Sequence, residues 1–280
     1  MSTDFQQARV TLGVRLHELR VEAGLTGRQL AERLGWTQSK VSKLETGKQT
    51  PTAEDLRAWA RGVESDETAA ELVARLNGFE TRYRTWRRQL ASGHRARQDL
   101  GAAELARSRR VRCFEPAIIP GLTQTADYAR HVFTHNAAFR ESPRDTEDAV
   151  RARLKRQEAL YDRDRCFDFL IWEGALHVLL CPPSAMAAQL DRLSNLIGLD
   201  TVSLGIIPFR APVRRSPGHG FMIYDDRLVT VETMNAEMWL DDPSDVQTYA
   251  KAWEWLSEPA VSGRSARRLI SLAQAALEGP

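Results

Sequence analysis

Apolar residues in the first sixty positions recur at helical spacing, and glycines separate the runs. The first run carries one apolar stripe, formed by Leu12, Leu16 and Leu19. The runs are followed by Gly24, Gly35 and Gly47. Glycine tolerates the positive φ that a helix C-cap requires. The pattern therefore predicts four short helices between residues 10 and 63 that pack as one unit.

Polar residues stand where these helices are expected to begin. Thr26 can cap the second helix while Gln29 closes a capping box, and Thr37 can cap the third. In the third helix only Val41 and Leu44 are spaced to point inward. A tight glycine turn is thus expected between the second and third helices.

From residue 111 onward, short runs of strand character alternate with helical segments. The expected strands are 111–114, 167–172, 202–207, 221–224 and 228–233. The expected helices are 122–134, 145–161, 184–197, 244–257 and 264–277. This order is typical of an α+β domain.

Composition narrows the class of protein. A chain of 280 residues with 42% hydrophobic content can bury one large core or two modest ones. No apolar run reaches the roughly 18 residues of a membrane span, and no signal peptide is recognised, so a cytoplasmic protein is expected. The three cysteines form no Cys-x-x-Cys pair, which argues against a disulfide framework or a structural zinc site.

The formal net charge of +2 hides a strongly basic block, residues 82–112. This basic block contains ten arginines against Asp99 and Glu104, whereas residues 64–81 are acidic. Its arginines either contact DNA phosphates, or cover apolar surface between packed helices and pair with the preceding acidic segment, 64–81, across a dimer. Both interpretations fit the sequence.

The outward face of the third helix carries no acidic residue. This face comprises Gln38, Ser39, Ser42 and Lys43, with Thr37 and Lys40 at the first turn. Glutamine can pair with adenine, lysine with guanine, and serine with bases or phosphate, and none of them repels phosphate. With a second helix packed behind it, this is the arrangement of a helix-turn-helix whose third helix enters the major groove. Lys48, Arg57 and Arg61 are either phosphate contacts or plain surface charges.

The stretch TGRQLAERLGWTQSKVSKLETGKQTP, residues 26–51, resembles the Cro/C1-type (XRE) DNA-binding domain of phage repressors and bacterial regulators. The match covers about residues 12–66 and rests on Leu30, Ala31, Gly35, Gln38, Ser39, Val41, Ser42, Glu45, Gly47 and Pro51. The resemblance implies that Gln38 and Ser39 contact DNA and that Arg20 forms a structural ion pair with Glu45. Where the family often has a glutamine, this chain has Gly27 and Arg28, and Arg28 is expected to contact phosphate instead. The expected DNA-binding residues are Thr26, Arg28, Thr37, Gln38, Ser39, Lys40, Ser42, Lys43 and Lys48.

The remaining chain, roughly residues 103–277, resembles the Scr1-like domain that follows an XRE domain in many actinobacterial regulators. The motifs that carry this resemblance include IPGLTQTADYAR (119–130), RLKRQEAL (153–160), QLDRL (189–193), IIPF (206–209) and GHGF (218–221). The departures are Thr123, where a second leucine is usual, and a longer loop over 210–216. The resemblance implies regulators commonly encoded beside a small partner protein, an arrangement likened to antitoxin and toxin.

Catalysis is poorly supported by the C-terminal residues. His131 and His135 are spaced as metal ligands, but the glutamate that zinc hydrolases place between them is missing. Glu173 and Glu232 could form a carboxylate pair or could be paired with arginines. A small-molecule pocket could be lined by Trp172, Phe209, Phe221, Trp239, Trp253 and Trp255, although an aromatic core explains them equally well.

These observations predict an all-α helix-turn-helix domain over 8–66, a helical basic connector over 67–110 and an α+β domain over 111–280. The first functional hypothesis is a sequence-specific regulator that binds an operator as a homodimer and is not an enzyme. The second is an antitoxin-like module that pairs with a small protein, with DNA binding used for autoregulation. A third is a repressor controlled by a small-molecule effector. No cofactor and no metal are expected.

Overall fold

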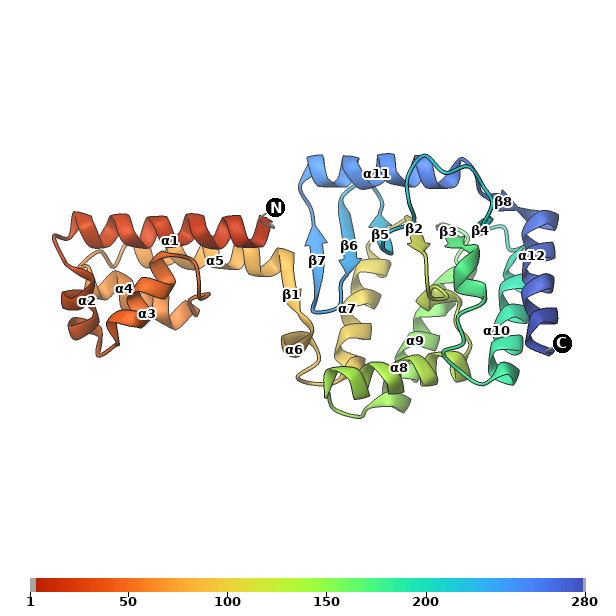
Figure 1. Ribbon diagram of the computed structural model, residues 1–280, viewed down its shortest axis with the longest axis horizontal. Coiled ribbons are helices and arrows are strands. Elements are labelled where there is room, and N and C mark those ends of the chain that lie inside the picture. The colour runs from red at the N-terminus through yellow and green to blue at the C-terminus, as the bar shows by residue number, and fades with distance from the viewer. Residues whose placement is uncertain (1–3, 279–280) are drawn as a thin grey trace. The chain divides into compact units, whose positions relative to one another are not determined.

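The computed structural model describes residues 4–278, and within this range all side chains except those of 4–7, 77–84, 87–88 and 278. The described chain divides after Tyr83 into two compact units, shown as ribbons in Figure 1. The helical unit precedes this residue, and the C-terminal unit follows it. None of the described helices is long and apolar enough to cross a membrane.

The helical unit contains five helices. They are α1 (Asp4–Glu22), α2 (Gly27–Leu34), α3 (Gln38–Glu45), α4 (Ala53–Gly62) and α5 (Thr68–Arg82). The leucine stripe of α1 is buried against residues of the other four, with Leu16, Leu30 and Leu56 fully buried. The four short helices expected from the sequence are present, and α5 completes their core.

The helix ends have the expected chemistry. The backbone φ angles of Gly24, Gly35 and Gly47 are +68°, +64° and +65°, in the left-handed region where a side chain is disfavoured. Thr26 and Gln29 form the capping box at the start of α2. Thr37 accepts a hydrogen bond from the backbone N–H of Lys40 at the start of α3. These caps fix the two helices and the turn between them.

One contact in the helical unit was not expected from the sequence. Gly13 of α1 is buried where the helix crosses α3. A Cβ at this position would lie 2.7 Å from the carbonyl oxygen of Leu44 and closer still to that of Glu45. The two helices can therefore approach this closely only because residue 13 has no side chain.

The C-terminal unit is an α+β domain, as predicted. Its strands are β1 (Tyr83–Thr85), β2 (Arg110–Glu115), β3 (Cys166–Trp172), β4 (Val202–Ile207), β5 (Phe221–Tyr224), β6 (Leu228–Glu232), β7 (Ala236–Leu240) and β8 (Val261–Ser262). Its helices are α6 (Trp86–Gln89), α7 (His94–Ala106), α8 (Ala126–Arg140), α9 (Thr146–Gln157), α10 (Pro183–Leu196), α11 (Pro243–Ser257) and α12 (Gly263–Ala275).

All eight strands form one mixed sheet in the order β1-β7-β6-β5-β2-β3-β4-β8. Strands β2, β3 and β4 are parallel, and the β2–β5, β5–β6, β6–β7 and β4–β8 pairs are antiparallel. Alternate residues of β2 and β3 enter two cores, because successive side chains of a strand point to opposite faces. Val111 and Phe169 join the core beneath α10 and α12, and Phe114 and Leu170 join the core beneath α11.

The structure differs from the sequence prediction in several places. Strands β1, β7 and β8 were not predicted, and α8 begins only at Ala126 because Gly121–Thr123 form a 3₁₀ turn. The predicted connector, 67–110, is not one element. Leu72 and Leu76 of α5 belong to the helical core, whereas Leu105 of α7 belongs to the core of the C-terminal unit. Its apolar residues therefore divide it between the two units.

Candidate nucleic-acid interface

The exposed face of α3 is the candidate site. Val41 and Leu44 are buried, as their spacing predicts. The side chains of Gln38, Ser39 and Lys43 are exposed and form no hydrogen bond or ion pair with the described part of the chain. The same holds for Ser42. This face of α3 therefore offers uncommitted donors and acceptors, together with one cation.

The N-terminal end of α3 adds to this face. The first turn of α3 contains no acidic residue. The unpaired N–H groups and the dipole of a helix make its N-terminus favourable for anions. The Thr37 hydroxyl takes up one of these N–H groups as the cap, so this side chain supports the helix start. A phosphate approaching this end would meet no repulsive charge on α3.

A nearly buried ion pair anchors the opposite end of α3. Arg20 Nε donates to Glu45 Oε1 at 2.6 Å, and a second guanidinium nitrogen donates to Oε2 at 3.0 Å. Each side chain is only 11% exposed. Burial alone would raise the pKa of Glu45, but hydrogen bonds from Arg20 and His17 outweigh burial and lower the pKa. The one carboxylate of α3 is thus directed into the domain and away from the candidate DNA face.

Two other residues of the expected site, Thr26 and Arg28, have partners within the domain. The Thr26 hydroxyl is part of the capping box with Gln29. Arg28 is exposed and pairs with Glu32 one turn further along α2, at 2.9 Å. Such an exposed pair costs little to break. Arg28 therefore remains available to a phosphate, whereas Thr26 serves first as a cap.

Lys40 does not face solvent as expected from the sequence. Its ammonium group lies 2.6 Å from Asp55 Oδ1 and 3.8 Å from the centroid of the Trp36 ring. The side chain thus turns back across α4, because a carboxylate and an aromatic face lie within its reach. Lys48, by contrast, is exposed and has no ion-pair partner among the described residues.

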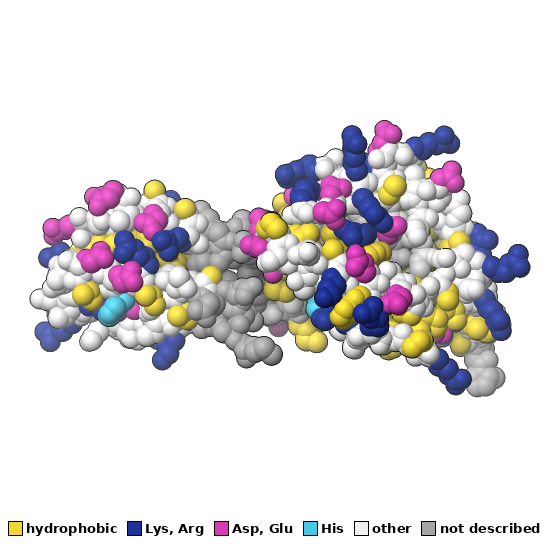
Figure 2. Space-filling model, turned by 90° about the horizontal axis from the view of Figure 1, so that it is seen from above, with side chains coloured by type: hydrophobic (Ala, Val, Ile, Leu, Met, Phe, Trp, Pro, Cys, Tyr) yellow, Lys and Arg dark blue, Asp and Glu magenta, His cyan; other side chains and the backbone are white. Residues whose placement is uncertain are grey.

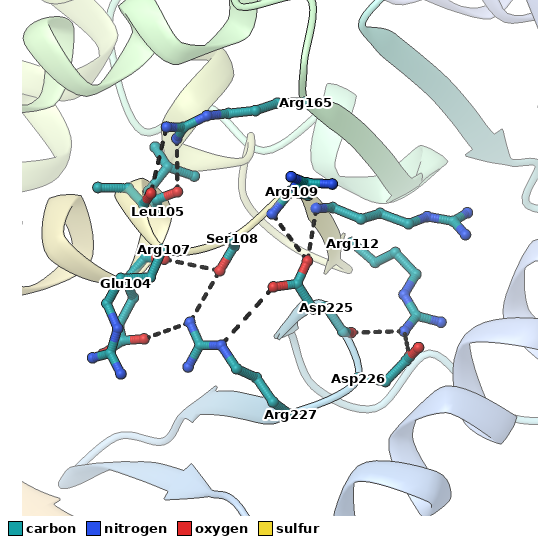
Figure 3. A network of polar contacts seen from close by, with 12 residues as sticks. Glu104, Leu105, Arg107, Ser108, Arg109, Arg112, Arg165, Asp225, Asp226 and Arg227 are labelled. Carbon is teal, nitrogen blue, oxygen red and sulfur yellow. Dashed lines mark hydrogen bonds and ion pairs between the residues drawn. The ribbon is translucent and has the colours of Figure 1, made fainter.

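The described arginines of the basic block are largely paired inside the C-terminal unit. Arg112 donates to Asp226 at 2.5 Å, Arg110 to Asp168 at 2.8 Å, and Arg97 pairs with the buried Glu237. The Arg112–Asp226 pair is part of a polar network around Asp225 that also contains Glu104 and Arg227 (Figure 3). The side chains of Arg82, Arg84, Arg87 and Arg88 lie outside the described residues. These described arginines therefore pair within the C-terminal unit, and not with the acidic segment 64–81 as expected from the sequence.

Charges of both signs also cover the C-terminal unit. On the face drawn in Figure 2, Lys and Arg side chains are interspersed with Asp and Glu. A surface that binds phosphates without regard to sequence usually presents a stripe of cations. This face presents no such stripe.

The C-terminal residues singled out from the sequence do not form one site. Glu173 accepts a hydrogen bond from the Phe209 backbone N–H at 2.6 Å, and Glu232 lies 3.9 Å from Arg97. The rings of His131 and His135 are 6.3 Å apart, and no cluster of three or more potential metal ligands occurs among the described residues.

The aromatic residues are also separated. Trp172 packs edge-on against Phe209, while Trp239 and Trp253 pack against different cores. Only Phe221 and Trp255 of this set line one pocket of the described chain. The prediction of a single pocket lined by all six aromatic residues is therefore wrong.

Comparisons with known proteins agree with this division. Residues 11–73 match a model described as a helix-turn-helix domain, and residues 97–271 match one described as a domain of unknown function, DUF5753. No protein of curated function matches the chain.

Among solved structures, the archaeal chromatin protein TrmBL2, described as showing a novel mode of DNA binding, matches at 12% identity and a TM-score of 0.31. That alignment covers 74% of this chain and 68% of the other. A likeness of this size carries no inference about this chain, whereas the DUF5753 match spans more than half of it. The chain therefore belongs to the DUF5753 family and carries an N-terminal helix-turn-helix domain that supports DNA binding.

Proposed function

We propose that this protein is a sequence-specific transcriptional regulator that reads an operator with α3 of its helix-turn-helix domain. The observation that carries the proposal is the exposed face of α3, where Gln38, Ser39 and Lys43 have no partner in the described chain. An uncommitted amide can pair bidentately with adenine, and an uncommitted ammonium can reach guanine. The orientation of Glu45 into the domain supports the same reading, because an acidic residue on this face would repel phosphate.

The proposal includes a homodimer on an inverted repeat. Two symmetry-related helices placed one DNA turn apart, about 34 Å, allow each half-site to contribute its modest energy twice. Assignment of the helical unit to the Cro/C1 type and of the C-terminal domain to the Scr1-like actinobacterial group belongs to the same proposal and rests on the motifs quoted above. We place such a regulator in the cytoplasm, on the nucleoid when bound, and assign it no catalytic activity. Pairing with a small partner protein remains a separate hypothesis, which co-purification would test.

Binding-site selection from random duplexes tests the proposal directly. The full chain should enrich an inverted repeat whose half-site centres lie about 10 base pairs, or one turn, apart. The mass of the complex should correspond to two chains per duplex. Recovery of unrelated sequences after repeated rounds would contradict specific reading, and one chain per duplex would contradict the dimer.

Two substitutions identify the reading residues. Gln38→Ala and Lys43→Ala should each weaken binding to the selected operator by about 1–3 kcal/mol and relax the preference at one position per half-site. Matched controls are Gln247→Ala and Arg163→Ala, which truncate an exposed amide and an exposed cation in the C-terminal unit. Unchanged selectivity in both α3 variants would remove these residues as readers.

A further inference from the structure

A small cavity in the C-terminal unit is lined by an unusual number of arginines. It has a volume of about 130 Å³ and lies between α7, α8 and α9 on one side and strands β2, β5 and β6 on the other. The charged residues of its lining are Arg97, Arg140, Arg153, Arg156, Glu115 and Glu232. This cavity, called the arginine cavity below, is separate from the α3 face.

Three of these arginines have no carboxylate partner in the described chain. Arg153 and Arg156 both donate to the same amide oxygen, Gln98 Oε1, at 3.4 and 2.8 Å. Arg153 also donates to Gln124, and Arg140 stacks over the Trp86 ring at 4.4 Å. The Nε atoms of Arg140 and Arg156 are buried and have no hydrogen-bond partner among the residues that the structure describes. Two cations thus converge on one neutral acceptor, and a third faces an aromatic ring.

Such an arrangement of cations is unfavourable without a counter-charge. Arg140, Arg153 and Arg156 are half-buried, and a partly desolvated cation normally pairs with a carboxylate, just as buried polar atoms are normally satisfied. The missing counter-charge affects the pKa of Arg153. Burial, and then repulsion by Arg156, lower this pKa to about 9. Arg97 shows the usual solution, because it pairs with the fully buried Glu237. Arg140, Arg153 and Arg156 have no such carboxylate partner within the described chain.

The acidic residues of the cavity do not compensate. Glu232 lies near Arg97, at 3.9 Å, and its side chain is two-thirds exposed. Glu115 is half-buried and forms no hydrogen bond or ion pair with another described residue. Burial and the neighbouring Glu232 raise the pKa of Glu115 to about 8. At neutral pH its carboxyl group is therefore mostly protonated and can donate a hydrogen bond to an anion.

Glycines keep room for these side chains. A Cβ on Gly101, in the middle of α7, would lie 2.9 Å from the guanidinium of Arg156. A Cβ on Gly220 would lie 2.9 Å from the carboxyl carbon of Glu115. A glycine inside a helix is less favourable than an alanine. Gly101 thus leaves space for the Arg156 guanidinium, although α7 would be more stable with alanine at this position.

We propose that the arginine cavity binds a small organic anion whose carboxylate or phosphate group is held by Arg140, Arg153 and Arg156. Guanidinium groups match the oxygens of both headgroups in geometry and charge. Apolar residues of the lining, among them Leu122, Phe133 and Met222, suit a short apolar body. A cavity of about 150 Å³ holds benzene, so this cavity of about 130 Å³ suits a smaller body, such as a short aliphatic chain.

Calorimetric titration of the full chain without DNA tests this site. The probes are propionate, a carboxylate on a short apolar chain, and inorganic phosphate. Binding of one copy per chain with a matching rise in melting temperature supports the proposal. Propionate alone identifies a carboxylate ligand, phosphate alone identifies a phosphate ligand, and both together identify a shared oxyanion site. Absence of heat and of a thermal shift with both probes at millimolar concentration would overturn it.

Variants locate the binding within the protein. Arg140→Met keeps the length of the side chain, and Arg140 stacks on the Trp86 ring without a carboxylate partner among the described residues, so the fold should tolerate it. This variant should bind the effective probe at least about tenfold more weakly, since a hydrogen bond to a charged group is lost. Without probe, its melting temperature should stay close to that of the wild type, because Arg140 has no carboxylate partner among the described residues and methionine can still pack on the Trp86 ring. If Arg140 had a merely structural role, its replacement would lower the melting temperature.

The control is Arg163→Met, an exposed arginine outside the cavity. It should leave probe binding unchanged. Equal binding by wild type and Arg140→Met, or equal loss in both variants, would refute the assignment to this cavity. Because no DNA is present, failure of this experiment leaves the operator-reading proposal intact, and failure of operator selection leaves this one intact.

Discussion

Gly13→Ala should destabilise the helical unit, although alanine is the better helix former. In an exposed helix the change would gain about 1 kcal/mol through propensity. Here the new methyl group would lie 2.7 Å from the Leu44 carbonyl oxygen and closer to that of Glu45, both of which are backbone atoms. A backbone carbonyl cannot rotate away as a side chain can, so α1 and α3 must separate.

The two effects can be compared in size. Overpacking in a well-packed core costs about 1–3 kcal/mol, and two backbone contacts place this site near the upper end. After the gain in propensity, a net loss of about 1–2 kcal/mol remains, which corresponds to a roughly 5- to 30-fold larger unfolded fraction. Amide hydrogen exchange of peptides from α1 and α3, measured on the full chain, should accelerate by that factor.

Gly27→Ala is the matched control. Residue 27 is also helical, and a Cβ there would make only an ordinary contact of 3.8 Å with Val41. Exchange in this variant should be unchanged or slower. Should Gly13→Ala exchange as slowly as Gly27→Ala, the close approach of α1 and α3 would not be a constraint on the fold.

Two further predictions concern charges. Glu45→Gln should lower the free energy of unfolding of the helical unit by about 2 kcal/mol, since the Arg20 guanidinium would lose its charged acceptor. The pKa of Glu45 is lowered in the folded state. Its contribution is therefore complete above the ordinary carboxylate value and is lost as the pH falls through the lowered value, so urea-unfolding curves of wild type and variant should converge in acid. A difference that stays constant with pH would rule out the ion pair as its source. For the basic block, Arg112→Ala should leave the salt dependence of operator binding unchanged because this arginine pairs with Asp226, whereas Lys48→Ala should reduce the slope by about 1 if it contacts phosphate. An equal reduction in both variants would return the basic block to the DNA interface.

Local signals accounted for much of the fold. The positive φ of Gly35 and the caps at Thr26 and Thr37 depend on residues within a few positions, so the sequence contains their whole explanation. Strands β2 to β6 were predicted because they are short runs rich in β-branched and aromatic residues. Strand β7 was missed because it includes a glutamate, Glu237, whose burial makes sense only beside Arg97, 140 residues away in sequence.

The two candidate sites also differ in whether their residues are neighbours in the sequence or are brought together only by the fold. The α3 face could be predicted because its residues are consecutive, although the turn of Lys40 toward Asp55 required knowledge of α4. The arginine cavity could not be predicted, because Arg140, Arg153 and Arg156 come together only through the packing of α8 and α9 on α7 and the sheet. In the basic block, arginines of identical appearance proved to have different partners, since pairing depends on the tertiary position of the acids.

The order of the two units along the chain has a consequence for synthesis. The core of the helical unit is supplied by residues 12–76, whereas Val111 in the middle of the sheet must wait for Tyr224, more than 100 residues later. Domains generally fold as units and in order as they leave the ribosome. A nascent or prematurely terminated polypeptide would thus present a finished helix-turn-helix while the rest of the molecule is still missing. Premature termination would therefore yield a fragment that competes with the complete protein for the same duplex.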